Sequence, residues 1–171
     1  VTLRGVDVLL VQPVQLVGKT SRVFAHLIDA NLGVANLIES DFAFLNRRLA
    51  EHYGIPGVEG EHIRKVELSP DSVRGGILAH ASIAKVTANG TTTSPVRRGN
   101  FILTNLLGVP TSPPPPNVGS IEPDTRGATT IRETLQKHQE IETCAACHRR
   151  IDPPGFAMEC FDPVGNFRER Y

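Results

Sequence analysis

The order of apolar and polar positions along the chain predicts a series of short helices. A first helix is expected from Thr20, a suitable N-cap, to about Ala30. A second is expected from Asp41 to Tyr53, because apolar residues recur there every three or four positions and Gly54 ends the pattern. The charged residues between the apolar positions of this second helix would form its solvated face. This is the pattern of a surface amphipathic helix.

The middle of the chain is broken by glycine and proline. Residues 65–68 are a candidate short strand, and residues 98–107 form an apolar helical pattern that stops at a glycine. Gly75 and Gly76 would allow a close backbone approach, for example of a helix to a flat ring system. Residues 109–119 are rich in proline, which favours an extended polyproline II segment.

The C-terminal third begins with a clear helix signal. Thr130 and Glu133 fit a capping box, and the helix that follows is expected to run toward Cys144. The predicted architecture is therefore mainly α, with long connections rich in proline and glycine. We divide it into an N-terminal helical segment, residues 1–66, and a second domain, residues 67–171.

Composition narrows the class of protein. The 171 residues carry 18 Lys plus Arg and 18 Asp plus Glu, so nothing in the charge favours nucleic acid or an anionic membrane as a partner. Apolar residues make up 40%, enough for a core, and this excludes a disordered or collagen-like chain. Apolar runs fall far short of the ~20 residues that span a bilayer. Because the chain starts at Val1, we expect a processed chain or a segment of a longer one.

One motif carries chemistry. Residues 144–148 read CAACH, and C-x-x-C-H is the attachment signature of c-type haem. Two thiols one helical turn apart can each add to a vinyl group of one porphyrin, and the adjacent His148 can then ligate the iron. Two other interpretations remain open. Cys144, Cys147 and Cys160 with one histidine can form a zinc site. A thioredoxin-like motif needs a strand followed by a helix that the motif opens, whereas here the motif is expected to close a helix or follow a loop.

The residues after the motif agree with haem. Residues 151–156 are expected to form a rigid turn containing Pro154, which can present a backbone carbonyl to the second ring nitrogen of His148. Phe156 is a candidate to cover the porphyrin edge. The alternative for these residues is a plain loop with core aromatic side chains.

Several segments together resemble the planctomycete-type c-type cytochromes, large secreted proteins built from several domains of mostly unassigned function. The similar segments are 41–46 (DFAFLN), 52–55 (HYGI), 74–78 (RGGIL), 93–96 (TSPV), 98–99 (RG), 107–108 (LG), 113–116 (PPPP), 144–148 (CAACH), 152–157 (DPPGFA) and 161–162 (FD). The resemblance implies an exported haem domain, periplasmic or extracellular, with Cys144 and Cys147 as thioether anchors and His148 as proximal ligand. Its partners would be redox proteins or other haem domains of a larger chain or assembly.

The sixth position of the iron has two leading candidates. His80 follows the glycine pair, and Met158 is the single methionine of the chain. Met158 lies only ten residues after His148, so the chain would have to turn round the porphyrin edge to bring it to the iron. Arg98 is a candidate partner for a haem propionate.

The sequence thus predicts a cytochrome c-like, haem-binding helical domain with one covalent haem that transfers single electrons. One alternative is a peroxidase-like haem enzyme with an open distal site. Another is an interaction domain stapled by zinc.

Overall fold

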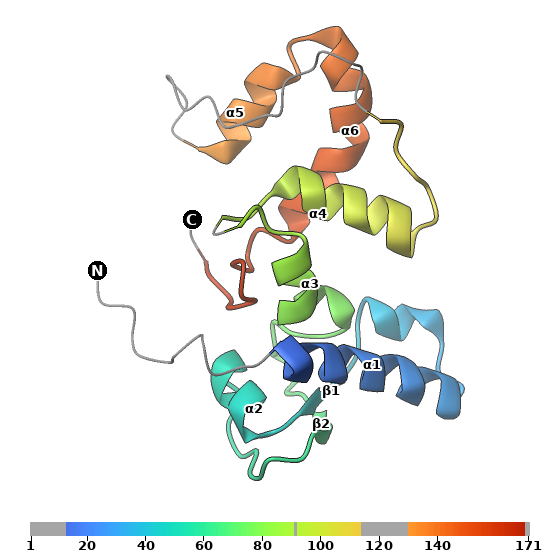
Figure 1. Ribbon diagram of the computed structural model, residues 1–171, viewed down its shortest axis with the longest axis vertical. Coiled ribbons are helices and arrows are strands. Elements are labelled where there is room, and N and C mark those ends of the chain that lie inside the picture. The colour runs from blue at the N-terminus through green and yellow to red at the C-terminus, as the bar shows by residue number, and fades with distance from the viewer. Residues whose placement is uncertain (1–12, 91, 114–129, 170–171) are drawn as a thin grey trace. The chain divides into compact units, whose positions relative to one another are not determined.

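The structure, a computed structural model, describes residues 13–90, 92–113 and 130–169 (Figure 1). The chain forms two compact units. The first unit comprises Val1–Thr93 and Met158–Tyr171, and the second comprises Ser94–Ala157. The chain is mainly helical, as predicted, with a two-stranded sheet in the first unit. The predicted division after residue 66, with a haem c-binding domain over residues 67–171, falls inside the first unit, and it stays a prediction.

The first unit combines the sheet with helices from across the N-terminal half. Its elements are α1 (Pro13–Asp29), η1 (Val34–Leu37), β1 (Phe42–Leu45), α2 (Arg47–Tyr53), β2 (Arg64–Glu67), η2 (Ile77–Ala79) and α3 (Ala81–Val86). The predicted strand at 65–68 is present one residue earlier. The first predicted helix is also present, but it begins at Pro13 rather than Thr20.

The predicted helix from Asp41 to Tyr53 is wrong in its first half. Residues 42–45 form β1, which pairs antiparallel with β2 so that Phe42 lies opposite Glu67. The helix α2 starts only after Asn46, whose side-chain oxygen accepts from the Leu49 backbone N–H at 3.0 Å. Aromatic side chains suit a strand as well as a helix, so the apolar spacing alone did not separate the two.

The core of the first unit lies between the sheet, α2 and α3. Leu45 and Leu49 are fully buried there, and Ala43, Ala50, Tyr53, Val58 and Ala81 complete the cluster. Each buried leucine contributes roughly 1.5–3 kcal/mol to folding. The Tyr53 hydroxyl accepts from the Ala81 backbone N–H at 3.0 Å, which ties α2 to the start of α3.

The second unit contains the cysteine motif. Its elements are α4 (Pro95–Phe101), the π-helical turn η3 (Ile102–Leu106), α5 (Ile131–His138) and α6 (Glu142–Ala157). The capping box of Thr130 and Glu133 is confirmed. The helix after it ends at His138, however, and a separate helix carries the cysteines. Of the proline-rich stretch 109–119, residues from 114 onward lie outside the described part of the chain.

Two glycines let α4 and α6 cross in backbone contact (Figure 1). A Cβ on Gly99 of α4 would lie 1.7 Å from the Ile151 carbonyl oxygen. A Cβ on Gly155 of α6 would lie 1.8 Å from the Pro95 carbonyl oxygen. No side chain fits at either place, so the crossing requires glycine on both helices.

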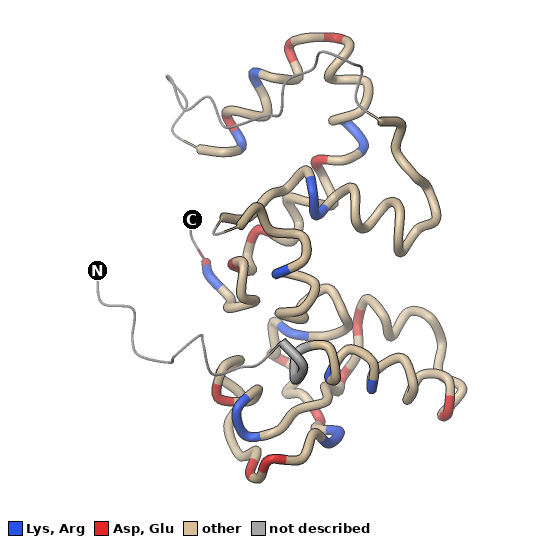
Figure 2. Tube along the Cα trace, in the orientation of Figure 1, with Lys and Arg blue, Asp and Glu red and all other residues tan. Residues whose placement is uncertain are grey.

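Figure 2 shows acidic and basic residues interspersed along both units, in keeping with the zero net charge. No helix among the described residues is long and apolar enough to span a membrane.

Candidate functional site

The cysteine motif lies in the first two turns of α6. Cys144, Cys147 and His148 are related by three and four residues, so they occupy one face of the helix. Both cysteines are partly exposed and neither forms a disulfide, whereas His148 is buried. The same face continues through Ile151 and Gly155, where it packs against α4. One face of α6 thus carries two partly exposed thiols and one buried imidazole, and the C-terminal half of this face packs against α4.

The imidazole of His148 is held by a carboxylate. Its Nδ1 lies 3.0 Å from Oδ1 of Asp152, which is 1% exposed, and the two residues are one helical turn apart. The second carboxylate oxygen, Oδ2, accepts from Nε2 of Gln139 at 2.8 Å. An ionised carboxylate only accepts, so Nδ1 carries the proton and Nε2 has the free lone pair. Nε2 is therefore the ring nitrogen able to bind a metal.

This arrangement corrects the predicted turn after the motif. Residues 151–156 continue α6, with Pro153 and Pro154 inside the helix, so they form no loop. The partner of Nδ1 is therefore a side-chain carboxylate and not a backbone carbonyl. The two prolines suggested a turn because they remove helix hydrogen bonds, but packing of this segment against α4 holds it helical.

Phe156, proposed to cover a porphyrin edge, borders a pocket of about 580 Å³. The guanidinium of Arg132 lies over its ring at 4.1 Å, and Asp152, Gln139 and Arg149 line the same pocket. The pocket therefore adjoins the carboxylate that holds His148. Its two arginines make its surroundings positively charged, which suits an acidic group.

His138, at the end of α5, packs against the imidazole of His148. Its ring meets that of His148 edge to face, with centroids 4.8 Å apart. Partial burial lowers the pKa of His138, the neighbouring His148 lowers it further, and Asp152 opposes both. The lowered pKa favours the neutral form of His138.

The buried Arg98 of α4 also belongs to the second unit. Its side chain is 0% exposed, so Arg98 is not a solvated surface arginine. A fully buried guanidinium needs acceptors or a negative charge to offset the loss of water. Its assignment to a haem propionate stays a prediction.

The two candidates for the sixth iron position belong to the first unit, and both are buried. Nδ1 of His80 lies 2.9 Å from the Thr20 hydroxyl. Burial lowers the pKa of His80 well below its usual value, and the nearby Lys19 and Arg74 add to this. His80 is therefore a neutral imidazole held at one nitrogen. The assignment of His80 or Met158 to the iron stays a prediction.

The glycine pair before His80 makes the close approach that the sequence predicted. A Cβ on Gly76 would lie 2.3 Å from the Ile38 carbonyl oxygen, and its φ of +66° also favours glycine. A Cβ on Gly75 would lie 2.8 Å from the Ser40 carbonyl oxygen. The surface that these glycines approach is thus the protein backbone.

The other interpretations of the cysteines have less support. Across the described ranges, no group of three or more His, Cys, Asp or Glu side chains is arranged to hold a metal ion. The cysteines do open a helix, contrary to the prediction that they close one or follow a loop. Helix α5 precedes them, however, so the strand that a thioredoxin-like motif needs is missing from the residues described just before α6.

Residues 74–171, more than half of the chain, match the family described as PSCyt3, a protein of unknown function (DUF1588). The chain belongs to the DUF1588 family. Residues 13–55 match a second family of unknown function, PSD4 (DUF1592). No curated protein and no solved structure matches the chain. The DUF1588 match includes the cysteine motif, Asp152 and His80, whereas α1 lies in the DUF1592 match.

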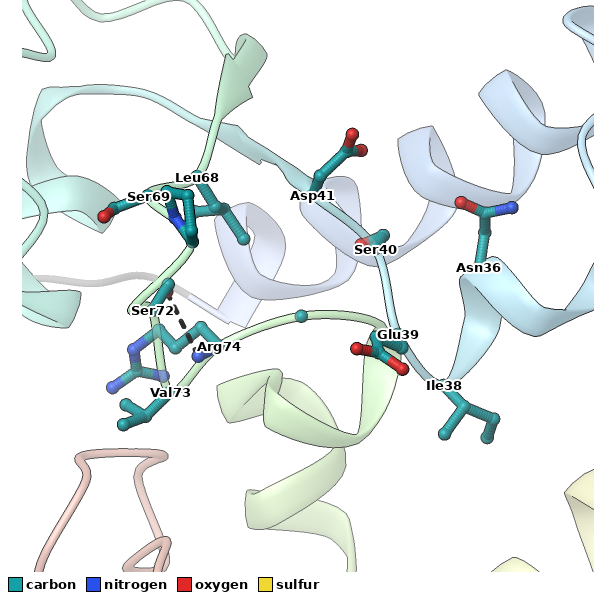
Figure 3. Close-up of a pocket in the computed structure, with 12 residues that line it drawn as sticks. Asn36, Ile38, Glu39, Ser40, Asp41, Leu68, Ser69, Ser72, Val73 and Arg74 are labelled. Carbon is teal, nitrogen blue, oxygen red and sulfur yellow. Dashed lines mark hydrogen bonds between the residues drawn. The ribbon is translucent and has the colours of Figure 1, made fainter.

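Figure 3 shows a second pocket, of about 610 Å³, which lies in the first unit beside the start of the DUF1588 match. Its acidic residues, Glu39 and Asp41, are exposed. The guanidinium of Arg74 is engaged by the backbone carbonyls of Ala79, at 3.2 Å, and Gly165, at 2.9 Å. This pocket contains no member of the motif, so we place the candidate site on α6.

Two residues of the site were missed by sequence reasoning. Asp152 stands four residues after His148, the spacing of neighbours on one helix face, and this signal was available once the segment is taken as helix. Gln139 is the C-cap residue of α5 and reaches Asp152 only through the packing of two helices. No local pattern of the sequence could have indicated it.

Proposed function

We propose that this chain is an electron-transfer c-type cytochrome domain with one haem attached to Cys144 and Cys147 and ligated by His148. The observation that supports the proposal best is the arrangement on α6. Two free, partly exposed thiols and an imidazole whose Nδ1 is already engaged lie on one helix face. This donor set fits the covalent haem of a C-x-x-C-H motif.

The residues have separate roles in this proposal. Each thiol would add across one vinyl group, with the sulfur bonding to one carbon and the hydrogen passing to the other, so no oxidant would be consumed. His148 offers Nε2 to the iron, since Asp152 fixes the proton on Nδ1. When bound, haem supplies a centre that takes up and releases one electron.

Other residues would complete the haem site. Arg98 is proposed to neutralise a propionate, and Phe156 with Pro154 to cover the porphyrin edge. His80 or Met158 is proposed for the sixth position. We further propose a periplasmic or extracellular location, since thioether attachment takes place outside the cytoplasmic membrane. Its redox partners would be other proteins or haem domains of a larger protein or complex.

The cysteines give a direct test with an internal control. We expect the protein, produced with a c-type haem maturation system, to keep one haem per chain in denaturing mass spectrometry. Cys144→Ala or Cys147→Ala should leave at most one thioether, and the double variant should carry no covalent haem. Cys160→Ala is the matched control, because Cys160 is a cysteine of the other unit and lies outside the C-x-x-C-H motif. Equal haem loss from all three single variants would contradict the proposal.

The carboxylate on His148 also favours a second candidate, a haem enzyme with an open distal site. A basic proximal imidazole stabilises higher oxidation states of a bound metal. Binding of cyanide separates the two functions. A six-coordinate electron carrier should resist cyanide, whereas an open site should bind it quickly.

A further inference from the structure

The strongest unassigned feature is the buried carboxylate of Asp152. It lies between α5 and α6, receiving His148 Nδ1 at 3.0 Å on one oxygen and Gln139 Nε2 at 2.8 Å on the other. Each oxygen thus has a donor in good hydrogen-bonding geometry. Two helices fix the carboxylate, so its position does not depend on a mobile side chain.

We propose that Asp152 is a positioning residue that fixes the metal-binding tautomer of His148 and lowers the reduction potential of the bound haem. This inference rests on the proposed function, because it concerns the haem that His148 would ligate. The inference adds to the proposed function that the reduction potential of this haem lies at the low end of the range for haems with the same ligands.

The first part of the argument concerns the proton. A carboxylate can only accept, so it selects the tautomer with hydrogen on Nδ1 and leaves Nε2 bare. A backbone carbonyl would select the same tautomer. The tautomer alone therefore does not distinguish Asp152 from a neutral partner.

The second part concerns charge. Asp152 is 1% exposed, so water screens its negative charge weakly. A negative charge on the far nitrogen makes the imidazole a more basic ligand, as carboxylates do for metal-bound histidines. Oxidised iron carries one more positive charge than reduced iron and gains more from this. The equilibrium therefore shifts toward the oxidised state.

The third part concerns the cost of burial. A carboxylate removed from water is destabilising unless positive charge compensates it. Among the described residues, its two hydrogen-bond partners are an amide and an imidazole, and neither is a permanent cation. Positive charge bound at Nε2 of His148 would offset this cost. Arg132 and Arg149, which line the pocket beside the carboxylate, supply part of this compensation, and a metal on the other side of the ring would add to it.

The test compares midpoint potentials of the haem-loaded protein. Asp152→Asn removes the charge but keeps the shape. Its Oδ1 can still accept from His148, and its amide can donate to Gln139 once the glutamine amide turns over. We expect the reduced form to be favoured by about tenfold, which is about 59 mV for one electron. Glu133→Gln is the matched control, since it removes the same charge from an exposed position of α5 and should leave the potential unchanged.

A second variant shifts the potential in the opposite direction and keeps the carboxylate. Gln139→Leu removes the donor to Oδ2, so the remaining charge acts more strongly on His148. We expect a smaller shift, of a few-fold, toward the oxidised form. A rise for Asp152→Asn with a fall for Gln139→Leu would support the inference. The inference would be overturned if the midpoint potential moved in the same direction in Asp152→Asn and Gln139→Leu. It would also be overturned if the shift in Asp152→Asn were no larger than that in Glu133→Gln.

A spectroscopic readout covers the tautomer. The ¹⁵N shifts of His148, recorded before haem is attached because bound iron would itself fix the tautomer, should place the proton on Nδ1 in the natural protein and in Asp152→Asn, and this should be lost in Asp152→Leu. A proton on Nε2 in the natural protein would overturn the inference. The optical spectrum, recorded first, separates the failures. Absence of haem would contradict both the proposed function and this inference. A haem protein whose midpoint potential does not change in Asp152→Asn would contradict this inference alone.

Discussion

The two units each bury a histidine, and the difference lies in what surrounds the ring. His80 and His148 are 3% and 8% exposed, and each is engaged at Nδ1. The partner of His80 is the Thr20 hydroxyl, and the nearby charges are the cations Lys19 and Arg74. The partner of His148 is a buried carboxylate. The same side chain is thus held neutral among cations in one unit, and in the other it has the carboxylate partner that suits the proposed metal ligand.

The backbone supports of the two regions are alike. Gly76 lets the chain before His80 pass against the Ile38 carbonyl, and Gly155 lets the helix of His148 pass against the Pro95 carbonyl. The two histidines therefore differ in the charges and hydrogen-bond partners around their rings and not in the backbone packing that supports them. A buried histidine is evidence for a metal ligand only when its second nitrogen and its neighbouring charges favour one.

The largest expected difference between the two units is in the effect of replacing their buried histidines on haem content. His148→Ala removes the proposed iron ligand, and we expect the ratio of haem to protein to fall about tenfold or more. His80→Gln should leave the amount of attached haem unchanged, since attachment depends on α6. The measurement is haem absorbance per chain after purification. Equal loss from both variants would show that His148 has no special role.

The helix crossing under His148 comes next in size. Gly155→Ala would place a Cβ 1.8 Å from the Pro95 carbonyl oxygen, so α4 and α6 must separate. We expect a loss of about 3 kcal/mol in the free energy of unfolding, measured by urea denaturation. Gly33→Ala serves as control, because a Cβ there meets no atom within 4 Å and its φ of −66° is ordinary. Two variants of equal stability would refute the crossing.

The smallest expected effect is on the pH dependence of the free energy of unfolding, and it concerns His80. Burial lowers the pKa of His80, so the unfolded chain takes up a proton before the folded one as the pH falls. The contribution of the neutral ring is present above about pH 6.5 and is lost as the pH falls below it, by at most about 1.4 kcal/mol per pH unit. His80→Gln, compared by thermal unfolding between about pH 7.5 and pH 5, should flatten this slope. An unchanged slope would assign the dependence to another group.

Local signals in the sequence were the more dependable ones. Thr130 and Glu133 predicted the start of α5 correctly, because a capping box involves only neighbouring residues. The strand β1 was taken for helix, since its pairing with β2 depends on residues 19 to 25 positions away. Aromatic and aliphatic side chains at those positions satisfy both structures.

The candidate site shows the same limit. The chain itself displays Cys144, Cys147 and His148, and the structure places them on one helix face. Pro153 and Pro154 favoured a turn, which hid the relation between His148 and Asp152. The helix survives the prolines because Gly99 and Gly155 allow α4 to pack closely against it, and such long-range packing leaves no local trace.

The most direct test of the central claim is the visible absorption spectrum of the purified protein, oxidised and then reduced with dithionite. The account predicts an intense Soret band that stays with the polypeptide after denaturation and acid extraction. Sharp reduced bands would indicate that a sixth ligand is bound. A featureless spectrum from protein produced in a host that matures c-type haem would contradict the account. A band that acid extraction removes from the chain would also contradict covalent attachment at Cys144 and Cys147.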